Sequence, residues 1–138
     1  MNRPRITVEV KIMADISTVW NCWTGPEHII HWNSASDDWH CPKAENDLQT
    51  GGKFKSTMAS KDGKMSFDFE GIYDEVINHK QIAYSLADGR QALVLFESLD
   101  NQTKITERFD PENTNSEELQ RAGWQSILDN FKKYAETK

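Results

Sequence analysis

The sequence has few of the features that mark secreted, membrane-spanning or nucleic-acid-binding proteins. Its 138 residues include two cysteines, Cys22 and Cys41, which are too few for a disulfide framework and fit a reducing cytoplasm. No apolar run approaches the length of a membrane span, and the N-terminus has no signal-peptide pattern. A net charge of −6 argues against nucleic acid or an anionic membrane as the main partner, because both need a basic surface. We therefore expect a cytoplasmic protein.

The sequence also lacks the short motifs of several large enzyme classes. It contains no G-x-S-x-G nucleophile elbow, no phosphate-binding glycine loop and no dinucleotide-binding fingerprint. It has no internal repeat or low-complexity tract, and 37% of its residues are hydrophobic, which is normal for a chain that builds one core. We interpret residues 1–138 as a single domain.

The first third of the chain predicts a strand and two short helices. Apolar and polar side chains alternate over residues 6–12, as in a half-buried strand. Asp15 is suited to cap a short helix, and Pro26 is suited to the first turn of a second one. Residues 33–52 are polar and irregular, and only residues 38–41 of that stretch are expected to form a short strand.

The rest of the chain predicts a sheet followed by one long helix. Four or five strands are expected between residues 50 and 110, with tight turns at 62–63, 88–89 and 100–101. Residues 117–137 have apolar side chains at helical spacing, preceded by Thr114 and Glu117 at capping-box spacing. The sheet must cover this helix, and a curved sheet around one helix leaves a cavity.

Three motifs in this order resemble those of the START-like (SRPBCC) superfamily. They are residues 19–28 (VWNCWTGPEH), 47–54 (DLQTGGKF) and 123–131 (GWQSILDNF), and the last is similar to the branch of the heat-shock-protein-90 ATPase activator. The resemblance covers nearly the whole chain. It implies an α+β helix-grip fold of the START/Bet v type, in which a bent antiparallel sheet grips the C-terminal helix around a cavity. It implies no particular ligand, because members bind lipids, hormones or polyketides and some are enzymes.

Glu107 is the strongest candidate for a functional residue. It shares one side of its predicted strand with Ile105 and Phe109, so it is expected to face the helix with them. A carboxylate in that position loses hydration, and it then needs a partner or has a raised pKa. The alternative is a hydrated carboxylate near the open end of the cavity, or one paired with an arginine.

Most other residues expected at the cavity are aromatic, although aromatic side chains more often fill a core than line a ligand site. Gly123 leaves a notch in the long helix, and Gly123→Leu is expected to fill it and abolish ligand uptake. With Glu107, the predicted ligand-binding residues are Trp39, His40, Phe67, Phe69, Tyr84, Phe96, Gly123, Trp124 and Ile127.

The segment 36–42 (SDDWHCP) is a second candidate region, because aromatic, imidazole, thiol and carboxylate groups on an irregular segment could line a cavity mouth. His28, His31, His40 and Cys41 include zinc-ligand residue types. Their spacing matches no recognised zinc pattern, so we expect no metal and no cofactor.

Three hypotheses about function follow. The first is binding of a small, largely apolar ligand without catalysis. The second is a cyclase- or hydrolase-type enzyme with Glu107 as general base and Tyr84 or His40 as proton partner, which requires these groups to lie within hydrogen-bond reach. The third is interaction with a chaperone, which is doubtful because the chain has nothing like the activator's separate N-terminal domain; a pull-down with the chaperone's middle domain tests it. The sequence leaves a homodimer open.

Overall fold

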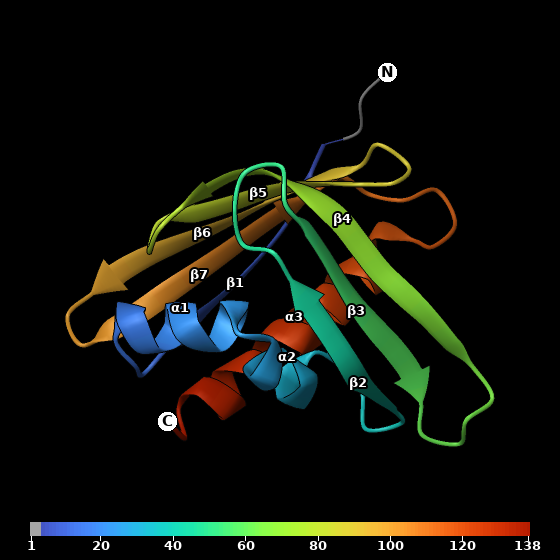
Figure 1. Cartoon of the computed structure of the whole chain (residues 1–138), viewed down its shortest axis with the longest axis horizontal. Helices are drawn as coiled ribbons and strands as arrows, with labels where there is room; N and C mark the ends of the chain where they lie inside the picture. The colour runs from blue at the N-terminus through green and yellow to red at the C-terminus, as the bar shows by residue number, and fades with distance from the viewer. Residues whose placement is uncertain (1–3) are drawn as a thin grey trace.

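The computed structural model describes residues 4–138, which form one curled antiparallel sheet and three helices (Figure 1). The strands lie in the order β1-β7-β6-β5-β4-β3-β2. The elements are β1 (Ile6–Ile12), α1 (Ile16–Thr24), α2 (Pro26–Trp32), β2 (Trp39–Asn46), β3 (Lys53–Ser60), β4 (Ser66–Ile77), β5 (Gln81–Leu86), β6 (Gln91–Leu99), β7 (Gln102–Phe109) and α3 (Glu117–Ala135).

The connections explain the arrangement of the sheet. Strands β2 to β7 follow one another as hairpins, and β7 then pairs with β1, so that β1 and β2 are the two edge strands. The short helices α1 and α2 carry the chain from one edge to the other, and α3 lies on the concave side of the sheet (Figure 1). The expected α+β helix-grip fold is confirmed.

Irregularities in two strands accompany the curl of the sheet. The register shifts between His40 and Lys43 in β2, and between Tyr73 and Glu75 in β4. Such bulges bend a strand and increase its twist. Gly71, just before the second bulge, lets the ring of Phe54 pack against the strand, since a Cβ there would lie 2.9 Å from that ring and 2.6 Å from a backbone oxygen.

The C-terminal half of α3 is the centre of the core. Leu128, Phe131 and Ala135 are fully buried on this helix. The ring centroid of Phe131 lies 4.9 Å from those of Trp23 in α1 and Trp32 in α2, and the two indoles stack on each other. This aromatic cluster holds the two short helices against α3.

Two local expectations need correction. Strand β2 extends to Asn46 rather than ending at residue 41, because after its bulge it continues to pair with β3. Helix α3 begins at Glu117 as expected, but its N-cap is Ser116, whose hydroxyl accepts from the Leu119 N–H, and the helix ends at Ala135. The three predicted hairpin turns are confirmed.

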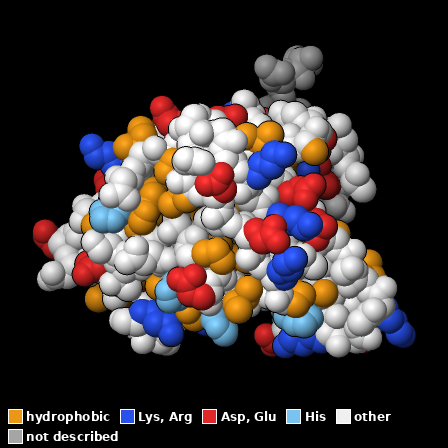
Figure 2. All heavy atoms as spheres, viewed as in Figure 1, with side chains coloured by type: hydrophobic (Ala, Val, Ile, Leu, Met, Phe, Trp, Pro, Cys, Tyr) orange, Lys and Arg blue, Asp and Glu red, His pale blue; other side chains and the backbone are white. Residues whose placement is uncertain are grey.

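The surface of the described residues agrees with the low content of basic residues. On the face shown in Figure 2, acidic and basic side chains are interspersed rather than gathered into a patch of one sign. Within residues 4–138, none of the helices combines the length and hydrophobicity that a membrane crossing requires.

Removing the Phe131 ring tests the aromatic cluster. Phe131→Ala should lower the free energy of unfolding by roughly 3–5 kcal/mol, because it leaves a cavity between three helices. Urea denaturation measures the change. Lys133→Ala, at an exposed position of the same helix, should change it by less than about 0.5 kcal/mol. Equal effects of the two substitutions would contradict a core centred on Phe131.

Candidate functional site

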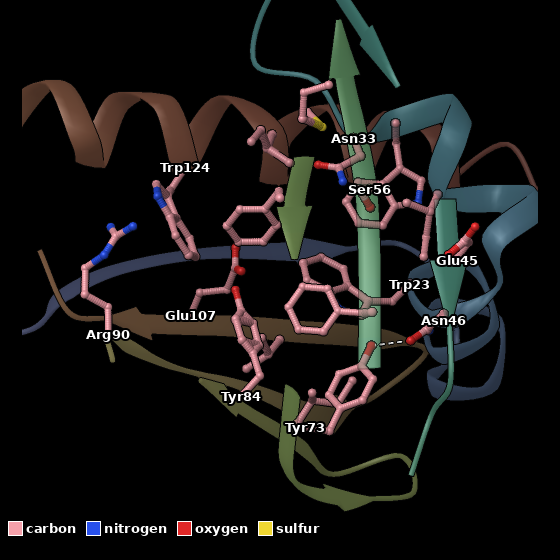
Figure 3. Close-up of a pocket in the computed structure, with 18 of the residues that line it drawn as sticks. Trp23, Asn33, Glu45, Asn46, Ser56, Tyr73, Tyr84, Arg90, Glu107 and Trp124 are labelled. Atoms are coloured by element: carbon pink, nitrogen blue, oxygen red, sulfur yellow. Dashed lines mark hydrogen bonds between the residues drawn. The ribbon is translucent and has the colours of Figure 1, made fainter. Parts of the chain in front are cut away.

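A cavity of about 360 Å³ lies between the concave side of the sheet and the middle of α3 (Figure 3). This volume is within the range of small-molecule sites. Strands β2 to β7, both short helices and α3 all contribute to its wall. Its aromatic lining residues are Trp23, Trp32, Phe54, Phe67, Phe69, Tyr73, Tyr84 and Trp124.

The position of Trp124 helps to explain why the space stays open. Its ring stacks flat on Phe109 of β7, with centroids 3.7 Å apart and planes at 9°. The indole therefore packs along the sheet, and the next inward residue of α3 towards its C-terminus, Ile127, is much smaller. Phe67, at the start of β4, also lines the cavity although it is 54% exposed. Phe67 therefore marks an opening to solvent.

Glu107 is buried in the wall formed by β7. It is 5% exposed and lies opposite Val8 in β1 and Val94 in β6. Its side chain points into the cavity between Trp124 and Tyr84 (Figure 3). Burial raises the pKa of this carboxyl group from its ordinary value of 4.5 to about 8, so it holds a proton at pH 7. Across residues 4–138, no side chain or backbone group forms a hydrogen bond or ion pair with it.

Tyr84 is an ionisable residue that lies beside Glu107 at this end of the cavity (Figure 3). Burial raises the pKa of its phenol, and negative charge on Glu107 raises this pKa further. Tyr84 therefore stays neutral. Within the described part of the chain, its hydroxyl makes no hydrogen bond with Glu107.

At the other end of the cavity, polar groups satisfy one another. The Tyr73 hydroxyl donates a hydrogen bond to the side-chain oxygen of Asn46, drawn as a dashed line in Figure 3. The Asn46 amide in turn donates to the Thr24 carbonyl oxygen at 2.6 Å. This chain of contacts ties β4, β2 and α1 together. Glu107 differs from these groups because its carboxyl lacks such a partner.

The charged residues of the lining other than Glu107 have partners nearby. The Arg90 guanidinium lies 2.7 Å from the Asp88 carboxylate in the same turn. Glu45 lies 3.2 Å from the Lys43 ammonium group on β2. Glu112 accepts a hydrogen bond from the Asn115 N–H.

Six of the ten predicted ligand-binding residues lie in the lining of this cavity. They are Glu107, Phe67, Phe69, Tyr84, Trp124 and Ile127. Phe96 instead packs in the core against Trp20 and Trp23, with centroids 5.0 and 5.9 Å away. Gly123 is not in the lining, and a Cβ there would meet no atom within 4 Å. A cavity-filling substitution must therefore be made at a lining residue.

Trp39 and His40 lie in a different hollow, of about 450 Å³, between α2, β2 and the C-terminal end of α3. Trp39 contacts the cavity wall through Phe67, at 5.8 Å between ring centroids. His40 is exposed and lines this second hollow, whereas Glu107 lines the cavity, so the expected pairing of His40 with Glu107 as proton partner is not seen.

Several lining residues were not predicted from the sequence. Ser56 could have been found, because it alternates with Phe54 and Met58 on one face of β3. Asn46 and Glu45 could not, because their segment was interpreted as irregular. Arg90 belongs to a turn, where no periodic pattern predicts which way a side chain points.

The histidines of the candidate zinc set have other contacts. The Nδ1 atom of His28 lies 2.6 Å from the Tyr134 hydroxyl, and the ring of His31 stacks on the same tyrosine. In the part of the chain that the structure describes, no three His, Cys, Asp or Glu side chains are grouped closely enough to hold a metal ion.

Comparisons with known proteins agree with this geometry. The AHSA1-like protein of Aeromonas hydrophila is 40% identical, with a TM-score of 0.88 over 96% of this chain and 93% of that chain. Chr148 of Cytophaga hutchinsonii is 51% identical, with a TM-score of 0.83 over 96% and 92% of the two chains. A protein of Nitrosomonas europaea, 17% identical, shares the fold with a TM-score of 0.83 over 97% and 95%.

A search of curated proteins gave no match. The family described as Activator of Hsp90 ATPase homolog 1-like protein matches residues 13–136, which include both short helices, β2 to β7 and all of α3. This chain belongs to the family of Activator of Hsp90 ATPase homolog 1-like proteins, within the START-like superfamily.

Proposed function

We propose that this chain binds a small, largely apolar ligand in the cavity between the sheet and α3, with Glu107 as the polar anchor. The observation that carries the proposal is the Glu107 carboxyl group, which lies in the wall of an aromatic cavity, stays accessible from it, and makes no hydrogen bond or ion pair within residues 4–138. Buried polar groups in folded proteins are nearly always hydrogen-bonded. A ligand that supplies the missing partner gains more from that contact than it would in water, because the surroundings are apolar.

The same geometry favours binding over catalysis. Acid–base catalysis needs a second group placed to accept or donate the transferred proton. Tyr84 makes no hydrogen bond with Glu107 among the described residues, and His40 lines the other hollow. Interaction with a chaperone stays a prediction for the pull-down experiment.

Filling the cavity should abolish binding of an apolar probe. N-phenyl-1-naphthylamine is a neutral dye whose fluorescence rises in apolar surroundings, and its volume fits a cavity of 360 Å³. Ser56→Phe places a ring in the cavity and should weaken dye binding at least tenfold in a fluorescence titration, an effect of about 1.4 kcal/mol.

The matched control puts the same ring on the outer face of the same strand. Thr57→Phe should change dye affinity less than about twofold, because Thr57 points away from the cavity towards Asp68. Circular dichroism confirms that both variants are folded, and Ile127→Trp replaces Ser56→Phe if the latter is not. Dye affinity that is equal in wild-type and cavity-filled proteins would rule out this cavity as the binding site.

Protonation of Glu107 should make stability depend on pH. The native state holds this proton up to about pH 8, whereas the unfolded chain releases it near pH 4.5. The free energy of unfolding should therefore fall as pH rises from 4.5 to about 8. The side chain of Glu107→Gln cannot ionise, so the free energy of unfolding of this variant should rise relative to that of the wild type across the same pH range. The difference should reach several kcal/mol, roughly 1.4 kcal/mol per unit of pKa difference.

Urea denaturation at pH 5 and pH 9 measures this difference. Glu97→Gln, at an exposed position on β6, serves as the control and should follow the pH dependence of the wild type. A Glu107→Gln protein that gains no stability relative to the wild type at pH 9 would show that the Glu107 carboxylate is hydrated.

A further inference from the structure

The charge and shape of the cavity around Glu107 indicate one chemical class of ligand. We propose that the ligand is an organic cation, an amine with an apolar body, whose ammonium group forms an ion pair with Glu107. This inference rests on the proposed function, because it specifies what occupies the cavity.

The charges of the lining support a cationic ligand. Three carboxyl groups and one guanidinium line the cavity, from Glu45, Glu107, Glu112 and Arg90. Arg90 is already paired with Asp88, and Glu45 with Lys43. Across residues 4–138, Glu107 is the acid of this lining that is buried without a counter-ion.

An anionic ligand would find no equivalent partner. A protonated Glu107 donates one hydrogen bond to the ligand's carboxylate, but the negative charge itself stays uncompensated, because Arg90, the basic residue of the described lining, is paired with Asp88 at the turn. A neutral alcohol could form one hydrogen bond with Glu107. An ammonium group gains both the hydrogen bond and the charge attraction, and charge-assisted hydrogen bonds are the stronger ones.

The aromatic rings near Glu107 favour a cation as well. Trp124 and Tyr84 lie on either side of the Glu107 side chain (Figure 3). Phe69 joins them, with its centroid 6.4 Å from that of Trp124 and 6.3 Å from that of Tyr84, edge to face in both pairs. Aromatic faces carry partial negative charge and attract ammonium groups within about 6 Å. The acid and the rings therefore favour the same type of head group.

Binding of an amine should release a proton. The free amine enters as an ammonium ion, and Glu107 gives its proton to solvent to become the carboxylate of the ion pair. The other ionisable groups facing the cavity are Tyr73, Tyr84, Glu45, Arg90 and Glu112. Burial raises the pKa of both tyrosines, which stay neutral. The released proton is therefore assigned to Glu107.

Three ligands with the same hydrocarbon body and different head groups test the proposal. Phenylbutylamine, phenylbutanol and phenylbutyrate are each titrated at pH 7 against protein loaded with N-phenyl-1-naphthylamine. We expect the amine to displace the dye at least tenfold more effectively than the alcohol, and the carboxylate to be the weakest. Calorimetry in buffers of different ionisation enthalpy should show release of about one proton for the amine and none for the alcohol.

The Glu107→Gln variant isolates the charge. Glutamine keeps the size and hydrogen-bonding capacity of the side chain, so phenylbutanol should bind within about twofold of its wild-type affinity, while the advantage of the amine and the proton release disappear. Glu97→Gln, on the exposed side of β6, should retain both. An amine advantage that survives in Glu107→Gln overturns the proposal.

The two proposals fail in different ways. If the dye binds but the amine has no advantage over the alcohol or the carboxylate, the inference about the cation is wrong and the cavity remains a binding site. If the wild-type protein binds neither the dye nor any of the three compounds, the proposed function is wrong, and the cation inference is overturned with it.

Discussion

One helix of 19 residues cannot fill the concave side of a seven-stranded sheet. The rest of the structure depends on which part of the helix–sheet interface is packed with side chains and which part stays empty. The C-terminal half of α3 is covered by the rings of Trp23 and Trp32, which the two short helices supply. The middle of the helix, where Trp124 lies flat on Phe109, borders the cavity instead. The core and the cavity are therefore two ends of the same helix–sheet interface.

The fold could be predicted from the sequence because its elements are encoded locally. Alternation in the strands, Asp-Gly turns and the helical spacing of residues 117–135 each act over a few residues. Strand β2 was predicted too short for the opposite reason. Pro42, Lys43 and Glu45 show no apolar alternation, and the strand exists because its backbone pairs with β3 across a bulge. Pairing with a distant segment leaves no local pattern.

The same local patterns predicted which side chains of the candidate site face inward. Alternation in β7 correctly placed Glu107 on the inner face between Ile105 and Phe109. Alternation also placed Phe96 on the inner face, but it could not tell that α1 covers that part of β6, so Phe96 belongs to the core. Periodicity gives the direction of a side chain, and only the assembled helices decide whether it meets another side chain or empty space.

The exposure of Phe67 has a consequence for how quickly the interior exchanges with solvent. This ring belongs to the cavity wall and is also more than half exposed at the end of the β3–β4 hairpin. Because the cavity wall reaches solvent at this ring, entry there does not require α3 to separate from the sheet. Residence times inside the protein are then set by contacts and dehydration along this passage, independently of the slow opening motions that a sealed chamber would impose.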